Sequence, residues 1–178
     1  MASSVEAPPE EAPDTSEVVV KFTAQYHPEA HALLAKEGPA PILHACVPVC
    51  GGLFMVVMDR VHGQVAWQVR RRKELLPNAV FKDTHKAIDL LHFKNFVFID
   101  LRMPNILVVS DKSGSHAQSH RMLIDFDWVG LHGIGRYPAS LDDNLEDFMY
   151  SGIEQYGIMN KAHDLVMLDK FKGQCHLD

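Results

Sequence analysis

The chain has 178 residues, of which 47% are apolar, and its formal net charge is −6. This length suits one domain or a small two-lobed one, and the apolar fraction is large enough to form a hydrophobic core. The negative charge disfavours nucleic acid as a partner, and no run of about eighteen apolar residues is present that would span a membrane. Cys46, Cys50 and Cys175 make no disulfide framework, which favours a cytoplasmic, or at least intracellular, location.

The N-terminal part of the sequence predicts a tail followed by a strand and a helix. Residues 1–16 are rich in Pro, Glu, Ser and Ala and offer little to bury, so we predict a disordered acidic tail. The β-branched run at 17–22 predicts a strand. Residues 27–38 predict a helix, because Pro28 stands near its start and Gly38 at its end.

The middle of the chain predicts a strand pair, a connector and a longer helix. The two strands are expected at 42–49 and 53–61, with a Gly51-Gly52 turn between them. Residues 68–78 predict a connector that contains the basic run 70–73. This run is typical either of a solvated connector or of a nuclear-localisation or phosphate-binding patch. The apolar spacing at 81–95 predicts a helix.

The C-terminal half predicts several short strands separated by loops. Three apolar runs are read as strands: 96–99, 105–109 and 121–126. The polar stretches between and after them predict loops at 110–120 and 130–138. Two weaker helical patterns follow, at 141–151 and 160–170. We find no internal repeat.

Polar side chains stand where these apolar strands give way to loops. Asp100 precedes a turn restricted by Pro104, Asn105 follows it, and Asp125 ends the next strand. Two carboxylates and one amide oxygen can then converge, and oxygen ligands of this kind suit Mg²⁺ held together with substrate phosphates. The alternative is a pair of turn-forming residues, because Asp and Asn both favour turns.

The same residues resemble a known family. The segment Asp100–Asn105, DLRMPN, matches the D-L-x-x-x-N core of the protein-kinase catalytic loop, and Asp125-Phe126-Asp127 looks like a variant of D-F-G. Together with VKF, HPEAHALLAKEGPAP, GRYP and HDLVML, these motifs resemble the kinase-like domain proteins of fungi. That family is related to protein kinases and, more loosely, to aminoglycoside and choline phosphotransferases. The resemblance extends over about residues 17–170.

The resemblance implies a fold and a division of the chain. The expected fold is α+β: a two-lobed protein-kinase-like fold with a truncated N-lobe and a short, mainly helical C-lobe. A partial N-lobe and hinge would occupy 17–61, and 62–178 would form the C-lobe with the catalytic and metal loops. The implied function is ATP-dependent transfer of the γ-phosphate to a hydroxyl of a protein Ser or Thr or of a small molecule, with ATP and Mg²⁺ as cofactors.

The resemblance also implies a role for each matched residue. Asp100 would orient the substrate hydroxyl, and Arg102 would lie near the transferred phosphate. Asn105 and Asp125 would hold Mg²⁺. The remaining implied positions are the phosphate-contacting lysine, its ion-pair partner on the following helix, the hinge residues whose backbone binds adenine, and a helix carboxylate that anchors the catalytic loop: Lys21, Glu29, Met58, Asp59, Arg60 and Asp164.

The sequence departs from the family pattern in ways that favour an alternative. No glycine precedes Gly38, so the glycine-rich loop is missing, and Phe98-Ile99 replaces the usual His-Arg. Asp127 replaces the glycine of D-F-G, where we expect a surface residue, and no A-P-E follows. The alternative is a pseudokinase, or a truncated kinase-like binding module that makes little or no use of ATP.

Other metal-like patterns favour structural roles. His27 and His31 have the i, i+4 spacing of metal ligands, but no further ligands accompany them. His44, Cys46 and Cys50 have poor spacing for zinc, so core thiols are the preferred interpretation.

Overall fold

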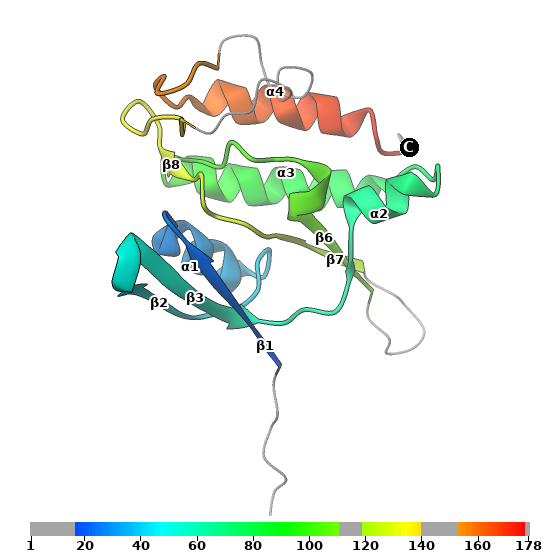
Figure 1. The fold of residues 1–178 in the computed structure, drawn as a ribbon. Coiled ribbons are helices and arrows are strands. Elements are labelled where there is room, and N and C mark those ends of the chain that lie inside the picture. Colours follow the sequence, from blue (N-terminus) through cyan, green and yellow to red (C-terminus); the bar gives the residue numbers. More distant parts are fainter. Residues whose placement is uncertain (1–16, 111–118, 140–152, 177–178) are drawn as a thin grey trace, which may run out of the picture.

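The computed structural model describes residues 17–110, 119–139 and 153–176 (Figure 1). The expected tail at 1–16 and the expected helix at 141–151 lie outside these residues. The fold is α+β, as predicted. A three-stranded sheet and α1 form the lower part in Figure 1, and the longer helices α3 and α4 form the upper part. None of the described helices is both long and apolar enough to cross a membrane.

The N-terminal sheet contains three antiparallel strands in the order β1-β3-β2. Their bounds are Val18–Thr23 for β1, Leu43–Val49 for β2 and Leu53–Asp59 for β3. β2 and β3 are joined by a tight turn in which Gly51 and Gly52 have φ values of 80° and 73°, a region that favours glycine. The prediction of a strand pair with a glycine turn is therefore confirmed.

Helix α1 spans Pro28–Glu37 and connects β1 to β2. Its N-terminus is capped by His27, whose Nδ1 accepts the N–H of Ala30, and its C-terminus ends at Gly38 with φ 97°. The buried residues Ala30, His31 and Leu34 lie along the face that packs against the rest of the molecule. This helix is confirmed almost at its predicted bounds.

A second small sheet has the order β4-β6-β7. The strands are β4 (Gln64–Val65), β6 (Ile106–Ser110) and β7 (Ser119–Leu123). Helix α2 follows β4 directly and spans Ala66–Arg71, within the region predicted as a connector. That prediction was wrong for 68–71, because Gln68 accepts the N–H of Val65 at the helix start and Ala66 packs in the core.

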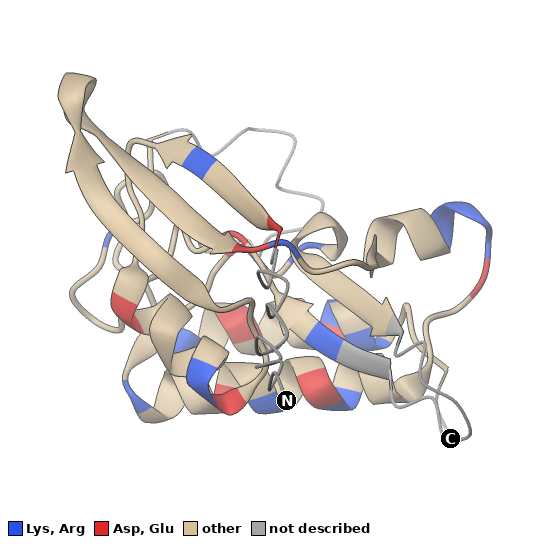
Figure 2. Cartoon of the chain, turned by 90° about the horizontal axis from the view of Figure 1, so that it is seen from below, with Lys and Arg blue, Asp and Glu red and all other residues tan. Residues whose placement is uncertain are grey.

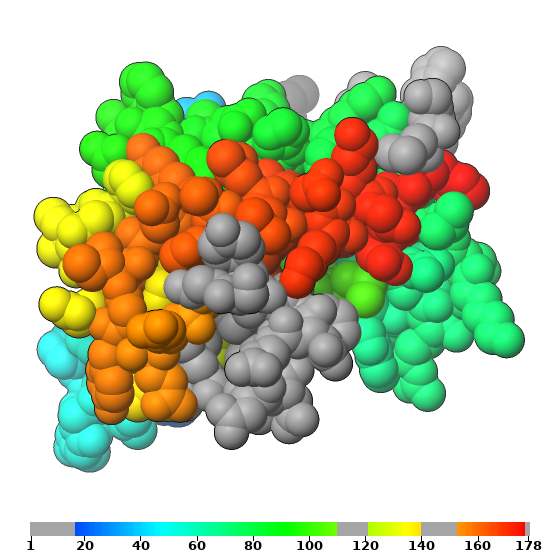
Figure 3. Space-filling model, turned by 90° about the horizontal axis from the view of Figure 1, so that it is seen from above, coloured from blue at the N-terminus to red at the C-terminus, as the bar shows by residue number. Residues whose placement is uncertain are grey.

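The remaining part of the molecule is mainly helical. Helix α3 spans Asn78–Phe93 and begins three residues before its predicted start, directly after Pro77; α4 spans Lys161–Lys172. In the space-filling view from above, α4 crosses the face of the molecule beside α3 (Figure 3). A two-stranded sheet joins β5 (Phe96–Val97) to β8 (Gly130–Leu131), and a 3-10 turn, η2, spans Met103–Asn105.

Two of the predicted strands are shorter than expected. The strand at 96–99 ends at Val97, because Phe98 and Ile99 turn away to bond a side chain of α4. The strand at 121–126 ends at Leu123, so Asp125 lies in the loop that follows it. Both changes place polar residues on turns rather than on strands.

One main hydrophobic core runs across the molecule. It joins Ala30 and Leu34 of α1 to Ile88 and Leu91 of α3 and to Phe126. Residues of α4 complete the same cluster. Because α1 shares this core, its position relative to the helical part is set by packing.

Charged side chains are sparse on the three-stranded sheet, which is mostly uncharged in the view from below (Figure 2). The three strands carry two acidic or basic residues, Lys21 and Asp59. Burying even part of a lone ammonium is unfavourable unless it is paired. The partners of Lys21 therefore identify the part of the molecule that faces this sheet.

Candidate functional site

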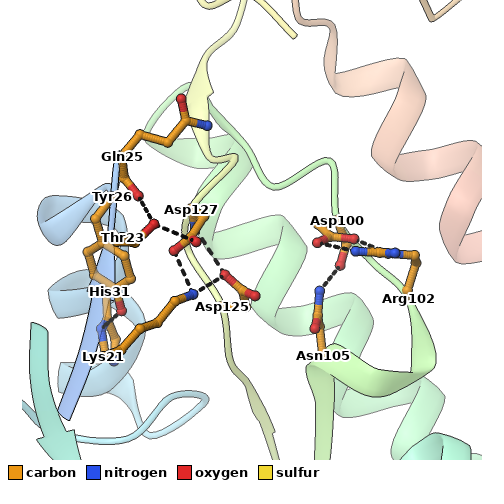
Figure 4. A network of polar contacts seen from close by, with 10 residues as sticks. All are labelled: Lys21, Thr23, Gln25, Tyr26, His31, Asp100, Arg102, Asn105, Asp125 and Asp127. Atoms are coloured by element: carbon orange, nitrogen blue, oxygen red, sulfur yellow. Dashed lines mark hydrogen bonds and ion pairs between the residues drawn. The ribbon is translucent and has the colours of Figure 1, made fainter. Parts of the chain in front are cut away.

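Lys21 bridges the N-terminal sheet to the segment after β7 (Figure 4). Its Nζ lies 2.8 Å from Oδ1 of Asp125 and 2.8 Å from Oδ1 of Asp127. The Lys21 side chain is 28% exposed. Burial lowers the pKa of Lys21, but the hydrogen bonds and charges of the two carboxylates outweigh burial, so its pKa is raised. The ammonium therefore stays charged at neutral pH.

Asp125 reaches this position because the chain turns sharply after β7. Its φ is 71°, in the left-handed region that Asp tolerates better than most residues. The preceding N–H, of Ile124, donates to the carbonyl oxygen of Asn105 at 3.0 Å. This bond connects the loop of Asp125 to the Asp100–Asn105 segment, so the two segments that carry predicted metal ligands are neighbours.

Asp127 is not the surface residue that the sequence analysis favoured. Its side chain is 21% exposed, with Oδ1 on Lys21 and Oδ2 accepting from Thr23 Oγ1 at 2.8 Å. Burial raises the pKa of Asp127, while the bonds to Lys21 and Thr23 oppose this rise. The prediction was wrong because Lys21 and Thr23 lie two residues apart on β1 and so face the same side.

Asp100 lies in the loop after β5 and is 6% exposed. Arg102 donates to both of its carboxylate oxygens, with Nη2 2.8 Å from Oδ2 and Nε contacting Oδ1. The hydrogen bond to Asp100 raises the pKa of Arg102, with further contributions from the charges of Asp100 and Asp125. The guanidinium also lies over the ring of Trp128, 5.6 Å from its centroid.

Asn105 ends the η2 turn and is 8% exposed. Its Nδ2 donates to the carbonyl oxygen of Asp100 at 3.0 Å, which assigns the amide nitrogen and leaves Oδ1 as an acceptor. Asp100 and Asn105 are therefore held together within one turn, next to the loop of Asp125 (Figure 4).

The loop of Asp100 is anchored from α4 by Asp164, as predicted. Asp164 is fully buried, and its oxygens accept the backbone N–H groups of Phe98 and Ile99 at 2.8 and 2.7 Å. His92 Nε2 lies 2.9 Å from Oδ2 of the same carboxylate. Ile99 has φ 61°, a strained value for a β-branched residue, directly before Asp100.

Helix α1 contacts the same region through an aromatic stack. The ring of His31 lies parallel to that of Phe126, with centroids 4.5 Å apart and an interplanar angle of 7°. His31 Nε2 lies 2.8 Å from the carbonyl oxygen of Pro41, and its Nδ1 lies 2.7 Å from the hydroxyl of Tyr26. Burial lowers the pKa of His31 and raises that of Tyr26. The middle residue of the DFD segment is thus fixed against α1.

Glu29 does not form the expected ion pair with Lys21. Its side chain is 73% exposed, and Oε2 lies 3.2 Å from Nδ1 of His27. The residues of α1 that point inward are Ala30, His31 and Leu34. Glu29 lies on the outer side of the first helical turn, so the carboxylates of Lys21 come from the DFD segment instead.

The predicted hinge also differs. Met58 and Asp59 still belong to β3, and the N–H groups of Asp59 and Arg60 donate to the carbonyl oxygens of Ile42 and Glu17 at 2.9 and 2.8 Å. These two donors are therefore already used within the sheet and are not available to an adenine ring. The chain leaves the sheet at residues 60–63, which form neither helix nor strand.

Asp125 and Asn105 carry the types of oxygen donor that Mg²⁺ prefers when it is held with phosphates. Lys21, Asp125 and Asp127 together carry one net negative charge, whereas Asp100 and Arg102 neutralise each other. Asp125 and Asn105 offer a carboxylate and an amide oxygen from adjoining loops. Among the described residues, no group of three or more His, Cys, Asp or Glu side chains is arranged to hold a metal. Phosphate oxygens would therefore have to complete the coordination, as is common for Mg²⁺.

The sequence analysis missed four residues of this site. Thr23 and Tyr26 gave no signal because their contacts depend on how the elements pack, and the sequence indicated His31 only through its spacing from His27. Trp128 follows the DFD motif directly, and its position beside Arg102 depends on the turn at Asp125.

Comparisons with known proteins support the fold. No family model matches the chain, and no curated protein matches it. Among the solved structures, the chain is similar to that of the Cydia pomonella granulovirus kinase PK-1, with a TM-score of 0.66 and 17% sequence identity. The match covers 90% of this chain and 60% of the viral kinase chain, so this chain spans about three fifths of that protein's length. The chain thus has a protein-kinase-like fold.

Proposed function

We propose that the chain is an ATP-dependent phosphotransferase of the protein-kinase-like type, which transfers a γ-phosphate to a hydroxyl of a protein or a small molecule. The observation that carries the proposal is the contact between Lys21 and Asp125, 2.8 Å apart and 104 residues apart in sequence. This contact connects the lysine strand to the DFD segment, beside the loop of Asp100 and Asn105. The resemblance to fungal kinase-like proteins supports the same assignment.

In this proposal residues 17–61 act as the N-lobe and hinge, and residues 62–178 act as the C-lobe. The ammonium of Lys21 binds nucleotide phosphates. Asp125 and Asn105 hold Mg²⁺, which supplies charge neutralisation at the phosphate oxygens. Phosphoryl transfer needs positioning and charge stabilisation more than covalent help from the protein, so a small set of fixed side chains suffices.

Asp100 is proposed to orient the acceptor hydroxyl. Its carboxylate is now paired with Arg102, and both groups lie at the loop that α4 anchors. A hydroxyl that donates to Asp100 would replace one of these bonds, and Arg102 would then be free to turn toward the transferred phosphate. The pair therefore keeps a buried carboxylate satisfied until an acceptor binds.

The adenine ring is proposed to meet the backbone at residues 61–63. The predicted hinge residues Asp59 and Arg60 cannot offer their N–H groups, because these already donate to the carbonyl oxygens of Ile42 and Glu17.

A second candidate function, a pseudokinase-type binding module, is favoured by two observations. Lys21 and Asp100 are both already paired with oppositely charged side chains. In addition, residues 1–37 contain no glycine, so these residues do not supply the glycine-rich loop that covers the phosphates in kinases. In this case the chain would keep the fold as a binding surface and transfer no phosphate.

A titration with Mg·ATP separates the two functions. We expect thermal stabilisation of the protein, reaching about 2.7 kcal/mol when ATP is present at about one hundred times its Kd. The variant Asp125→Asn should lose this stabilisation, whereas Asp100→Asn should keep it and lose release of ADP from ATP, measured with a coupled assay.

The outcomes have distinct meanings. Stabilisation without ADP release by the wild-type protein would support the binding module. The absence of any shift at millimolar Mg·ATP would contradict the nucleotide site itself, and unchanged ADP release by Asp100→Asn would contradict the role assigned to Asp100.

A further inference from the structure

The partner of the phosphate-binding lysine is unusual in this chain. In protein kinases this lysine pairs with a glutamate on the following helix, and the pair must be in place for activity. Here the helix glutamate Glu29 is 73% exposed and contacts His27. The inward face of α1 carries Ala30, His31 and Leu34, so α1 offers no buried carboxylate to Lys21.

Asp127 makes the contacts that hold Lys21 in place. Both of its oxygens are engaged on β1, Oδ1 by Lys21 and Oδ2 by Thr23, each at 2.8 Å. Thr23 Oγ1 also lies 3.0 Å from the carbonyl oxygen of Gln25, so its single hydroxyl hydrogen lies between two acceptors, of which the Asp127 carboxylate is the nearer. Asp127 therefore bonds to two side chains on one face of β1 and fixes this strand relative to the DFD segment.

Asp125 shares Lys21 but is held less firmly. Its Oδ1 accepts from Lys21 and, at 3.4 Å, from the N–H of Asp127. Its side chain is 36% exposed, compared with 21% for Asp127. The two carboxylates beside the Lys21 ammonium can therefore have different roles: Asp127 holds the lysine, and Asp125 faces the ligand.

We propose that Asp127, which stands where protein kinases have the glycine of D-F-G, is the positioning residue that holds Lys21 in place of a helix glutamate. This inference rests on the proposed function, because the lysine is held for nucleotide phosphates. It explains why this chain can dispense with the Lys21–Glu29 pair, and it leaves Asp125 for the metal position.

The contact can be tested without any nucleotide. Acylation of lysines with an amine-reactive ester at one fixed pH, followed by mass spectrometry, gives the rate at Lys21 relative to Lys36, an exposed lysine on α1. We expect Asp127→Asn to raise this relative rate about tenfold, because one bond between charged groups is lost. Thr23→Val should raise it less, and Asp127→Glu should restore part of the protection.

The role toward phosphates is tested by binding of Mg·ATP, measured by calorimetry on the same variants. We expect Asp127→Asn and Asp127→Gly to bind about tenfold more weakly than the wild type, with Asp127→Glu recovering part of the loss. Glu29→Gln is the matched control and should bind like the wild type. Far-ultraviolet circular dichroism shows whether each variant is folded.

The results distinguish this inference from the proposed function. If the wild type binds no Mg·ATP, the proposed function fails, and with it the purpose assigned to Asp127. If the wild type binds Mg·ATP but acylation of Lys21 and binding are unchanged in Asp127→Asn, the positioning role alone is wrong. Weakened binding by Glu29→Gln together with unchanged binding by Asp127→Gly would return the role to the helix glutamate.

Discussion

Asp164 shows how a single buried carboxylate fixes the loop that carries Asp100. The positive φ of Ile99 has an energetic cost of about 1–3 kcal/mol, because a β-branched side chain rarely adopts this backbone conformation. The N–H groups of Phe98 and Ile99 both donate to Asp164, and these bonds offset the strain. The direction of the next residue, Asp100, depends on this arrangement.

Replacing Asp164 with Asn should therefore destabilise the protein. One carboxylate oxygen becomes an NH₂ group that faces a backbone N–H, so one buried donor loses its acceptor. We expect the free energy of unfolding to fall by about 3 kcal/mol, measured by urea denaturation.

Asp169 provides the matched control, since it lies on the same helix but is exposed. Asp169→Asn should unfold like the wild type. An Asp164→Asn protein as stable as the Asp169→Asn protein would show that the loop does not depend on this carboxylate.

At the scale of residues, sequence alone located the loops but not all of the contacts. Asp100 and Asp125 could be singled out because each stands at the end of an apolar run, and Asn105 because its spacing from Asp100 matches a known motif. Asp127 and Glu29 could not be assigned correctly, because the partner of Lys21 depends on which side chains face the inner surface of β1. Such long-range contacts leave no local pattern.

At the scale of elements, α1 depends on one buried histidine. A carbonyl oxygen can only accept, so Nε2 of His31 must donate to Pro41. In the neutral ring Nδ1 is then the acceptor for the hydroxyl of Tyr26. Protonation would put a second N–H where this acceptor is needed, inside a buried stack with Phe126.

This geometry predicts a pH dependence of stability. The pKa of His31 is lowered by burial, below the value of about 6.5 that it has in the unfolded chain. Between these two pKa values the unfolded state binds more protons, so the free energy of unfolding should fall as the pH drops below about 6.5. Urea denaturation between neutral and mildly acidic pH measures the slope.

Burial also lowers the pKa values of His27 and His163, so they add to the same slope. The amide of Gln in His31→Gln can still donate to Pro41. In this variant we expect only the part of the pH slope that comes from His27 and His163. A His31→Gln protein with the full slope would show that His31 does not titrate as proposed.

The elements themselves were largely predictable. α1, β2 and β3 lie close to their predicted bounds because proline, glycine and β-branched residues mark them. α2 was missed because its basic residues resemble a connector, whereas its Ala66 and Val69 pack against the core. The early ends of β5 and β7 depend on bonds to α4 and to Asn105, which no local pattern reveals.

At the scale of the whole molecule, the segment after α4 packs back against the residues just before α3. After α4, residue Cys175 pairs with Leu76, and the N–H of His176 donates to the carbonyl oxygen of Leu76 at 2.8 Å. Cys175 is buried, and burial raises its pKa to about 11. Cys50, in the turn between β2 and β3, is exposed.

Thiol labelling should therefore report separately on the β2–β3 turn, through Cys50, and on the C-terminal segment, through Cys175. In the native protein we expect Cys50 to react with a thiol reagent at the rate of an open thiol and Cys175 to react only when the protein unfolds. Mass spectrometry after timed labelling measures each site. In concentrated urea Cys50 and Cys175 should react at the same rate. Equal rates without urea would contradict the burial of Cys175 beside Leu76.

The overall architecture was predictable from the resemblance rather than from periodicity. Motifs in kinase-like order led to a two-lobed α+β fold, and the structural similarity to a viral protein kinase confirms a kinase-like fold. Sequence patterns did not reveal that a single main core joins α1 to α3 and α4, because this depends on how the elements pack.

The edge position of β1 determines how the site can be dismantled. Among the described strands, β1 pairs only with β3, and its outward residues Val18, Val20 and Phe22 are 46%, 49% and 59% exposed. Segments with few buried contacts open first in a folded protein. If β1 separated from β3, Lys21 would move away from Asp125 and Asp127, whereas the main hydrophobic core, which contains no residue of β1, would stay intact. A ligand that contacts both Lys21 on β1 and the carboxylates would therefore stabilise the attached strand, and β1 would open more often once the ligand dissociates.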